Sequence, residues 1–389
     1  MRKMTYVVIG GGYAGIHTVK AIQKKVQKKN QSHRVILIDP NPDHIKKVLL
    51  FKPAAKKTNI KIPFKRIFPN GVEIIQGFVT AINHFDKSIS VRRSSEEEIL
   101  INYDAVIITV GSTFQSMDRG GIELSSLNNA ERIHQRWKEN IQLAKHTDDK
   151  EERKRLLTVT VVGAGISGIE TSALLAEQIR LAAQSNGLSQ EVRVLLINSK
   201  ERLFMDGPEK LSRKLESRLK ELGVEVLHNE RATYEANGKL ELKSNKSIPT
   251  GLCIWTTGLV PNPILSNWEL PLTENGRLKV DSSYRVIGRV GMYSIGDCAR
   301  IIDPKNKMED KANCKEATIQ GKRLGKIIQA DLNKQKVPVH KKPMTTYCIG
   351  LGETQGLVWV ALPTFNLFLS GKLGYWIRKM TWDMASLVK

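Results

Sequence analysis

The chain has 389 residues, of which 41% are hydrophobic and 26% charged, with 29 glycines and 14 prolines. This composition predicts a globular protein of two or three domains and excludes disordered, fibrous and collagen-like chains. The formal net charge of +22 favours polyanionic partners, namely phosphorylated cofactors, anionic membranes or nucleic acid, or else a basic surface that only maintains solubility. No apolar run reaches the roughly 20 residues of a membrane-spanning helix, so we expect a cytoplasmic protein.

The first expected unit is a strand over residues 6–9, a glycine-rich turn, a helix to about residue 27, and a second strand over residues 34–38. The turn reads Gly10-Gly11-Gly12-Tyr13-Ala14-Gly15. In a G-x-G-x-x-G turn the first glycine permits the sharp bend, the second admits a pyrophosphate, and the third lets the helix pack on the strand. Asp39 ends the second strand, where a carboxylate can accept both ribose hydroxyls, and this favours the AMP half of FAD.

The same pattern recurs about 150 residues later. A strand over residues 157–162 precedes a second turn, a helix to about residue 183 and a strand over residues 192–197. The turn reads Gly163-Ala164-Gly165-Ile166-Ser167-Gly168. Two such units predict two bound dinucleotides. The position that matches Asp39 is Asn198, which can bond a ribose but does not repel a 2′-phosphate, so NADPH is not excluded beside NADH.

Three further strands end in turns that could touch a cofactor. They are followed by Thr109-Val110-Gly111, Thr256-Thr257-Gly258 and Gly296-Asp297. Each alone could be an ordinary turn, and only their order in the chain indicates a site. The four cysteines contain no CxxC pair and no zinc-like spacing, so we expect neither a redox disulfide nor a metal site.

Read in order, these motifs resemble the two-dinucleotide-binding-domain flavoproteins, most closely the type II NADH:quinone oxidoreductases. The resemblance implies an α/β fold with two Rossmann-like, doubly wound dinucleotide-binding domains, the FAD domain discontinuous, and a C-terminal amphipathic segment. The implied FAD domain comprises residues 1–120 and 260–335, the NAD(P) domain residues 121–259, and the C-terminal domain residues 336–389. The implied activity passes a hydride from NADH to FAD and then two electrons to a membrane quinone, menaquinone or ubiquinone.

The resemblance also assigns cofactor-binding residues. For FAD and NAD(P)H together they are Gly10, Gly12, Tyr13, Ala14, Gly15, Asp39, Lys52, Pro53, Val79, Thr109, Gly111, Gly163, Gly165, Ile166, Ser167, Gly168, Asn198, Thr257, Gly258, Gly296, Asp297 and Lys315. In the family the aspartate of the Gly-Asp loop bonds the ribityl chain, the segment that Lys52 and Pro53 resemble lies beside the isoalloxazine, and a backbone group at the position of Val79 touches adenine.

Two residues are predicted to be catalytic. In the family a glutamate at the position of Glu170 sits where nicotinamide meets flavin and can relay protons. Its alternative role is a carboxylate that the helix dipole stabilises. Lys315 stands where the family commonly has a glutamine that lines the quinone pocket, preceded by Cys314 in place of alanine. Lysine cannot imitate a carboxamide, so either the quinone is held differently or the electron acceptor is another molecule.

The C-terminus carries an amphipathic helical pattern. Its apolar positions are Leu373, Trp376, Ile377, Met380, Met384, Leu387 and Val388, whereas Lys372, Arg378, Lys379 and Asp383 fall outside this stripe. A basic amphipathic helix with tryptophan predicts binding to an anionic membrane surface, here the cytoplasmic face of the cell membrane. The alternative is that the stripe packs on the FAD domain.

Other functions remain open on the sequence. A basic surface also suits an NAD(P)H-dependent reductase of a small acidic redox protein of the ferredoxin or rubredoxin kind. A nucleic-acid-binding, redox-sensing flavoprotein is less favoured, because we find no aromatic-interleaved basic motif and no helix-turn-helix pattern. A second copy of this chain is a further partner that the sequence leaves open, in a homodimer.

Overall fold

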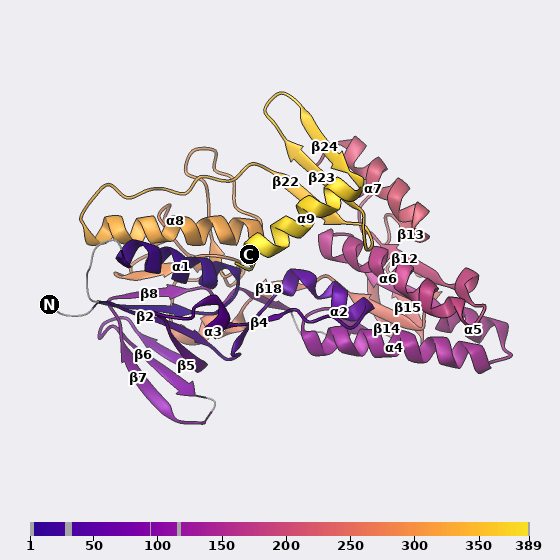
Figure 1. Ribbon diagram of the computed structural model, residues 1–389, viewed down its shortest axis with the longest axis horizontal. Coiled ribbons are helices and arrows are strands. Elements are labelled where there is room, and N and C mark those ends of the chain that lie inside the picture. Colours follow the sequence, from indigo (N-terminus) through magenta and orange to yellow (C-terminus); the bar gives the residue numbers. More distant parts are fainter. Residues whose placement is uncertain (1–3, 28–32, 94, 115–117, 388–389) are drawn as a thin grey trace.

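The computed structural model describes residues 4–27, 33–93, 95–114 and 118–387. Within these ranges the protein has a mixed α/β fold built around two large sheets (Figure 1). The first has the strand order β20 (Met292–Ser294), β8 (Ala105–Ile108), β1 (Met4–Ile9), β2 (His33–Asp39), β5 (Glu73–Asn83), β6 (Ser88–Arg93), β7 (Glu98–Asn102). The strands from β20 to β5 run parallel, and β6 and β7 extend the sheet antiparallel.

The first sheet is assembled from two separate stretches of chain. Strand β20 pairs with β8, although the whole second sheet lies between them in sequence. Two helices pack side by side over one face of the sheet, α1 (Tyr13–Gln27) and α8 (Cys314–Leu332) (Figure 1). The protein has two halves, the first built around the first sheet and the second around the second sheet. Between the sheets, β9 (Ser112–Phe114) pairs with β18 (Leu259–Pro261), so the chain crosses from the first half to the second and back at adjacent points.

The second sheet is entirely parallel. Its strand order is β10 (Ile122–Glu123), β17 (Leu252–Trp255), β11 (Thr158–Val162), β12 (Arg193–Ile197), β13 (Val224–Leu227). One face packs under α4 (Leu127–His146), α6 (Ile166–Gln184) and α7 (Glu209–Glu221). The other packs against a small sheet of β14 (Ala232–Ala236), β15 (Lys239–Leu242) and β16 (Ser247–Pro249). Burial on both faces explains why β17 and β12 are almost entirely apolar, whereas β11 also contains the buried threonines Thr158 and Thr160.

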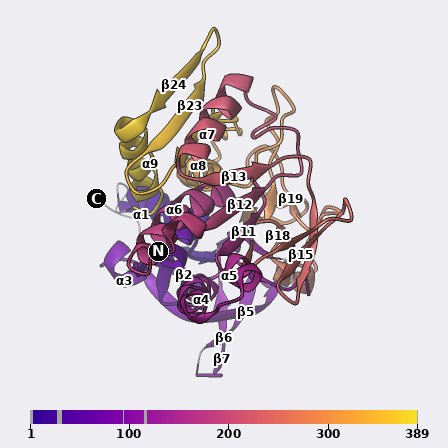
Figure 2. The ribbon, with the colours of Figure 1, turned by 90° about the vertical axis from the view of Figure 1, so that its right-hand side faces the viewer.

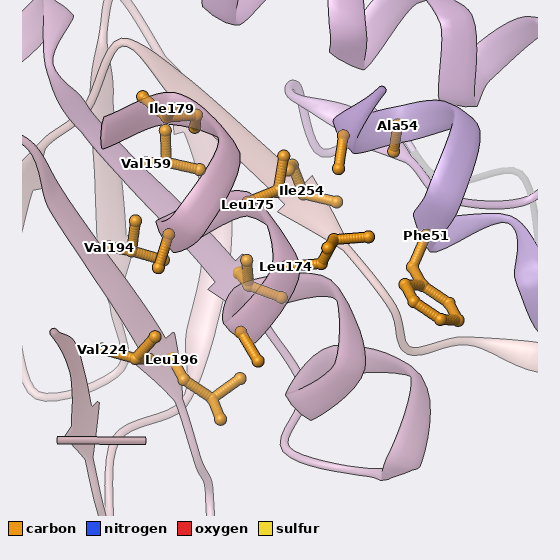
Figure 3. Close-up of a cluster of buried hydrophobic side chains, with 14 of the residues drawn as sticks. Phe51, Ala54, Val159, Leu174, Leu175, Ile179, Val194, Leu196, Val224 and Ile254 are labelled. Carbon is orange, nitrogen blue, oxygen red and sulfur yellow. The ribbon is translucent and has the colours of Figure 1, made fainter. Parts of the chain in front are cut away.

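A short helix of the first half, α2 (Phe51–Ala55), enters the core of the second. Figure 3 shows Leu174, Leu175 and Ile179 of α6 between the sheet and α2. On the α2 side they meet Phe51 and Ala54, which are 4% and 0% exposed. The two halves therefore share one apolar core rather than meeting only at a polar linker.

The C-terminal part forms a three-stranded antiparallel sheet and a helix. These are β22 (Thr346–Gly350), β23 (Gly356–Ala361), β24 (Asn366–Ser370) and α9 (Gly371–Ala385). Figure 2 shows β23 and β24 next to α7, and α9 also contacts α8. The remaining described elements are α3 (Phe64–Ile67), α5 (Lys150–Leu156), β3 (Asp43–Ile45), β4 (Lys61–Pro63), β19 (Leu278–Lys279), β21 (Ala299–Arg300) and short 3-10 segments at Lys47–Leu49, Ser189–Glu191 and Pro263–Trp268.

The two predicted strand, turn, helix and strand units are confirmed to within a few residues. The predicted helix ending near residue 27 is α1, and the one ending near residue 183 is α6. The α/β fold class is likewise confirmed. The antiparallel extension of β6 and β7 and the sheet of β22 to β24 were not predicted from the sequence.

Candidate functional site

The first glycine turn joins β1 to α1, and each of its glycines meets different surroundings. Gly10 has a φ of +101°, and a Cβ atom there would lie 2.6 Å from the carbonyl oxygen of Thr109. A Cβ atom on Gly15 would lie 1.9 Å from the Gly10 carbonyl oxygen. At Gly12, by contrast, a Cβ atom would have no neighbour within 4 Å. Protein packing therefore requires glycine at the first and third positions, whereas Gly12 faces open space.

The second glycine turn joins β11 to α6 and repeats this geometry. Gly163 has a φ of +106°, and its Cβ atom would lie 2.3 Å from Thr257 Cγ2. A Cβ atom on Gly168 would lie 1.8 Å from the Gly163 carbonyl oxygen, while one on Gly165 would have no neighbour within 4 Å. The chain thus builds the same shape twice, with the middle glycine open in both turns.

This shape fits the pyrophosphate of a dinucleotide. Each turn leads into a helix, so the unpaired N–H groups and the positive dipole end of α1 and α6 lie at the open glycine. Gly165 is the N-cap of α6, Ile166 and Ser167 begin that helix, and the Ser167 side chain is exposed. Nothing in the protein's own packing explains glycine at Gly12 or Gly165, and close approach of a ligand does.

Two threonines hold the turns in shape. The Thr109 hydroxyl donates to the carbonyl oxygens of Ile9 and Gly10, both at 2.8 Å. In the second turn the equivalent bonds, at 2.9 and 3.0 Å, come from Thr256 rather than Thr257. The hydroxyl of Thr109 is thus engaged within the protein, and the Thr257 methyl faces Gly163.

Asp39 lies at the carboxyl end of β2, against the first turn. Its Oδ2 accepts the Gly11 N–H at 2.7 Å and its Oδ1 accepts the Asn41 N–H at 2.8 Å. Burial raises the pKa of Asp39, and these two backbone hydrogen bonds oppose the rise. Val79 lies three residues beyond Gln76, the partner of Asp39 in the register of β2 and β5. The carboxylate and Val79 therefore lie at the same end of the sheet as the glycine turn.

The loop of Gly296 and Asp297, here called the Gly-Asp loop, lies against the first glycine turn. Gly296 has a φ of +79°, and a Cβ atom there would lie 3.1 Å from the Cβ of Ala14. Asp297 Oδ2 accepts the Ser112 hydroxyl at 2.8 Å. Gly111, with a φ of +68°, again has open space where a Cβ would be. Tyr13 points its hydroxyl to the Val48 N–H at 3.4 Å, so that side chain is directed into the protein.

Helix α2 places Lys52 and Pro53 between the two halves. The Lys52 ammonium lies 4.6 Å from the centroid of the Trp382 ring on α9. Burial lowers the pKa of Lys52. Pro53 is buried beside it. The segment expected beside the isoalloxazine is thus also in contact with the C-terminal helix.

Glu170 is the centre of a buried ion pair. Its Oε1 accepts from Arg378 Nε at 2.8 Å and from the Gly350 N–H at 2.7 Å, and its Oε2 accepts from Arg378 Nη2 at 2.9 Å. Glu170 is 1% exposed and Arg378 7%. The carboxylate therefore joins α6, β22 and α9, and its hydrogen bonds are directed within the protein.

Arg378 was not predicted as a site residue, because in the sequence it falls among the polar residues outside the apolar stripe of the C-terminal helix. The side of α9 that is buried carries Gly374, Trp382 and Ala385 together with Arg378. A Cβ atom on Gly374 would lie 2.4 Å from the Gly356 carbonyl oxygen, so this glycine lets α9 approach β23 closely. The glycine and the tryptophan on one side of the helix were the available signal.

The apolar stripe of α9 faces outward. Leu373, Trp376, Met380 and Met384 are 53%, 58%, 40% and 58% exposed. Leu387 packs against the core under α1 and α8, and Val388 lies outside the described residues. The alternative in which the stripe packs on the FAD domain is therefore wrong for these four exposed side chains, although Leu387 does pack there.

Lys315 does not extend freely into a pocket. Its ammonium donates to the Met344 carbonyl oxygen at 2.7 Å, and burial lowers its pKa. Cys314 begins α8, and Cys348 lies on β22. Burial raises the pKa of both thiols, and the positive charge of Arg378 opposes the rise.

Asn198 follows β12 and is engaged locally. Its Nδ2 donates to the Lys200 carbonyl oxygen at 3.1 Å and lies 2.8 Å from His228 Nδ1. Arg202 donates to the carbonyl oxygens of Phe204, Met205 and Gly207, so its guanidinium holds its own loop. Gly258 has a φ of +100° near Arg119.

Two features are absent from the described residues. Those residues contain no group of three or more His, Cys, Asp or Glu side chains that could hold a metal ion. Nor does any helix within them have the length and apolar character needed to cross a membrane.

Comparison with known proteins adds to this geometry. The family described as "Pyridine nucleotide-disulphide oxidoreductase" matches residues 4–321. A Dictyostelium discoideum protein named "Probable NADH dehydrogenase" is 27% identical, over 82% of this chain and 71% of that protein. The "Type II NADH:quinone oxidoreductase" of Haemophilus influenzae is 24% identical, over 78% of this chain and 75% of its own. The structure of NDH2 from Plasmodium falciparum in complex with NADH superposes with a TM-score of 0.83 at 18% identity, covering 98% of this chain and 94% of that one.

Proposed function

The chain belongs to the pyridine nucleotide-disulphide oxidoreductase family, and from that premise we propose that it is an FAD-dependent NADH dehydrogenase that delivers electrons to a membrane quinone. The observation that carries the proposal is the pair of turns whose middle glycines, Gly12 and Gly165, face open space. The names of the relatives favour quinone over a small redox protein as acceptor.

In this proposal each turn holds one dinucleotide. Gly10, Gly12, Gly15, Asp39 and Asp297 hold FAD, which supplies hydride acceptance and two-electron transfer when bound. NADH lies on the turn from Gly163 to Gly168. The proposed domain boundary at residue 120 lies before β10, the one at residue 259 lies at the start of β18, and the one at residue 335 lies after the end of α8. The chain's own part is to orient the two cofactors and to exclude water between them.

The contact among α2, α6 and α9 excludes water from the space between the two cofactors. The side chains of Phe51 and Trp382 are 4% and 2% exposed, with ring centroids 5.8 Å apart. The pair of Glu170 and Arg378 fixes α9 against α6 beside them. We propose that these groups form the wall between the nicotinamide position and the acceptor position, with Glu170 and Lys315 at its edge.

The acceptor side lies toward α9. Its outward stripe of Leu373, Trp376, Met380 and Met384 would enter the interface of an anionic membrane, with Lys372 and Lys379 exposed on the same helix. The membrane surface that α9 binds would be the cytoplasmic face of the cell membrane. Deleting α9 would be a poor test, because the deletion would also remove Arg378 and Trp382 from the core.

The decisive experiment follows flavin reduction and acceptor turnover separately. Purified protein should carry FAD, and anaerobic NADH should bleach the flavin absorbance. Oxidised menaquinone and ubiquinone analogues should then restore it. Rapid reoxidation by a ferredoxin-like protein, with none by either quinone, would replace the quinone by a protein acceptor. Failure of NADH and NADPH to bleach the flavin would refute the dehydrogenase proposal.

A further inference from the structure

A buried chain of polar side chains lies behind the Gly-Asp loop. The Gly296 N–H donates to Gln320 Oε1 at 2.8 Å, and Gln320 Nε2 donates to Asp310 Oδ2 at 2.8 Å. Asp310 Oδ1 lies 3.2 Å from Nε2 of His340. Gln320 and His340 are 3% and 1% exposed. The loop that presents Asp297 is therefore tied, through two side chains, to a buried histidine.

The hydrogen-bond donors around His340 determine which ring nitrogen carries the proton. Arg323 Nη1 lies 3.0 Å from His340 Nδ1 and also donates to the Tyr284 hydroxyl at 2.8 Å. That hydroxyl lies 2.9 Å from the same Nδ1. A guanidinium can only donate, so Nδ1 is the acceptor and Nε2 carries the proton toward Asp310. Asp310 thus receives two N–H donors, one from His340 and one from Gln320.

Glu316 lies beside this chain in the first turn of α8. Its backbone N–H donates to Asn313 Oδ1 at 2.9 Å, and its Oε2 accepts from Asn313 Nδ2 at 2.7 Å. It is 6% exposed. With Asp297, Asp310 and Gln320 it lines a cavity of about 10 Å³, close to the smallest volume that accommodates a water molecule. Glu316 therefore shares this cavity with Gly296 and Asp297 of the Gly-Asp loop.

The charges around Glu316 come from five parts of the chain. They are Arg277 and Asp297 across the cavity, Asp310 and Lys311 before α8, Lys315 on α8 and Lys342 before β22. Burial first, and then the Asp310 carboxylate, raises the pKa of Glu316 to about 7, while a backbone hydrogen bond from Lys311 and the charges of Lys342 and Lys315 oppose the rise. The group is therefore protonated below neutral pH and ionised above it, and both forms are populated near pH 7.

The proposed reaction leaves one proton to be supplied. Hydride transfer brings two electrons and one proton, whereas a quinol contains two, so NADH, H⁺ and quinone give NAD⁺ and quinol. We propose that Glu316 takes this second proton from solvent onto Oε1, the oxygen that Asn313 does not hold, when negative charge arrives at the flavin position. Glu316 gives the proton up on reoxidation, when the quinol takes its second proton. This inference rests on the proposed function. Glu316 is a positioning residue for the proton and touches no substrate.

The physical reason is electrostatic. The N-terminus of α8 is where reduction is expected to add negative charge to the flavin, and a carboxylate in the same helical turn gains proton affinity when that charge arrives. Proton uptake by Glu316 then limits the accumulated charge in a buried site. The hydrogen bonds from Gln320 and His340 hold the Asp310 carboxylate in place through the cycle.

The test is an anaerobic electrochemical titration of the bound FAD at a series of pH values, with no NADH or quinone present. The dependence of the midpoint potential on pH gives the number of protons taken up per two electrons. Wild-type protein should take up more protons around pH 7 than Glu316→Gln, by up to one per flavin. Gln keeps the oxygen that accepts from Asn313. Glu98→Gln, an exposed glutamate on β7, makes the same chemical change and should behave as wild type.

A second measurement follows the carboxyl group itself. Infrared difference spectra on flavin reduction should show a protonated carboxyl band in wild type that is absent in Glu316→Gln. Asp310→Asn, which removes the neighbouring charge, should move the pH at which this band appears downward. Equal proton counts in wild type and Glu316→Gln, or an unchanged carboxyl band, would overturn the inference. A purified protein without flavin would overturn both proposals. A protein that binds flavin but does not reduce quinone would overturn the proposed acceptor, and the proton count on flavin reduction would still test Glu316.

Discussion

Replacement of Arg378 by methionine tests the buried ion pair that joins α9 to α6. The substitution removes two of the three hydrogen bonds to Glu170 and leaves a carboxylate that is 1% exposed with only the Gly350 N–H. Breaking a buried pair by removing one partner costs about 3–5 kcal/mol, so we expect a loss of that size in the free energy of unfolding. The cause is the uncompensated charge, not the lost attraction alone.

The double variant Glu170→Gln with Arg378→Met separates these causes. A neutral glutamine can still accept from Gly350, so we expect the double variant to recover most of the loss, to within about 1 kcal/mol of wild type. Lys379→Met, on the exposed side of the same helix, is the matched control and should change stability by less than about 0.5 kcal/mol.

The assay is urea unfolding with FAD saturated in every sample, because bound ligand itself adds stability. The midpoint should fall for the single variant and largely return for the double variant. If Arg378→Met cost no more than Lys379→Met, or if the double variant were as unstable as the single one, the reasoning from a buried, uncompensated carboxylate would be refuted.

Four further outcomes follow from the site. Gly12→Ala should fold but lose FAD, whereas Gly165→Ala should keep FAD and lose reduction by NADH, as measured by absorbance; a change in secondary structure by circular dichroism would contradict the open space at these glycines. Asp297→Ala should lower flavin occupancy, and full FAD content in a folded variant would remove Asp297 from the site. Asn198→Asp should raise the preference for NADH over NADPH in stopped-flow reduction, and unchanged selectivity would argue against its placement at the ribose. Trp376→Glu should weaken binding to anionic vesicles in a flotation assay without slowing flavin reduction, and undiminished binding would move the membrane contact elsewhere.

The two dinucleotide turns could be predicted from the sequence, because each shows apolar strands without proline and the characteristic glycine spacing. Gly10 and Gly15 are required by contacts inside one turn and with the adjoining strand end, and the same holds for Gly163 and Gly168. Such contacts depend on residues close in sequence and on the sheet that apolar strands must form. The fold class was therefore predictable, and so were the turns.

The arrangement around Glu170 was decided only by tertiary structure. Arg378 is 208 residues from Glu170 along the chain, and no local pattern pairs them. Nor could the spacing of apolar residues in α9 decide which side is buried, because a helix with two distinct sides buries the one that finds a complementary partner. Here Gly374 admits β23 and Trp382 meets α2, so the more apolar stripe remains outside.

The hydrogen-bond partners of the polar side chains at the site were likewise decided by tertiary structure. Lys315 and Asn198 lie at the ends of their elements, as the sequence predicts. Met344, the partner of Lys315, and His228, one of the two partners of Asn198, come from segments about 30 residues away. Glu316 carried no sequence signal beyond a helix start. Its burial, and the neighbouring charge of Asp310, exist only once the loop before α8 folds over the Gly-Asp turn, because proton affinity depends on the charges and solvent nearby in space.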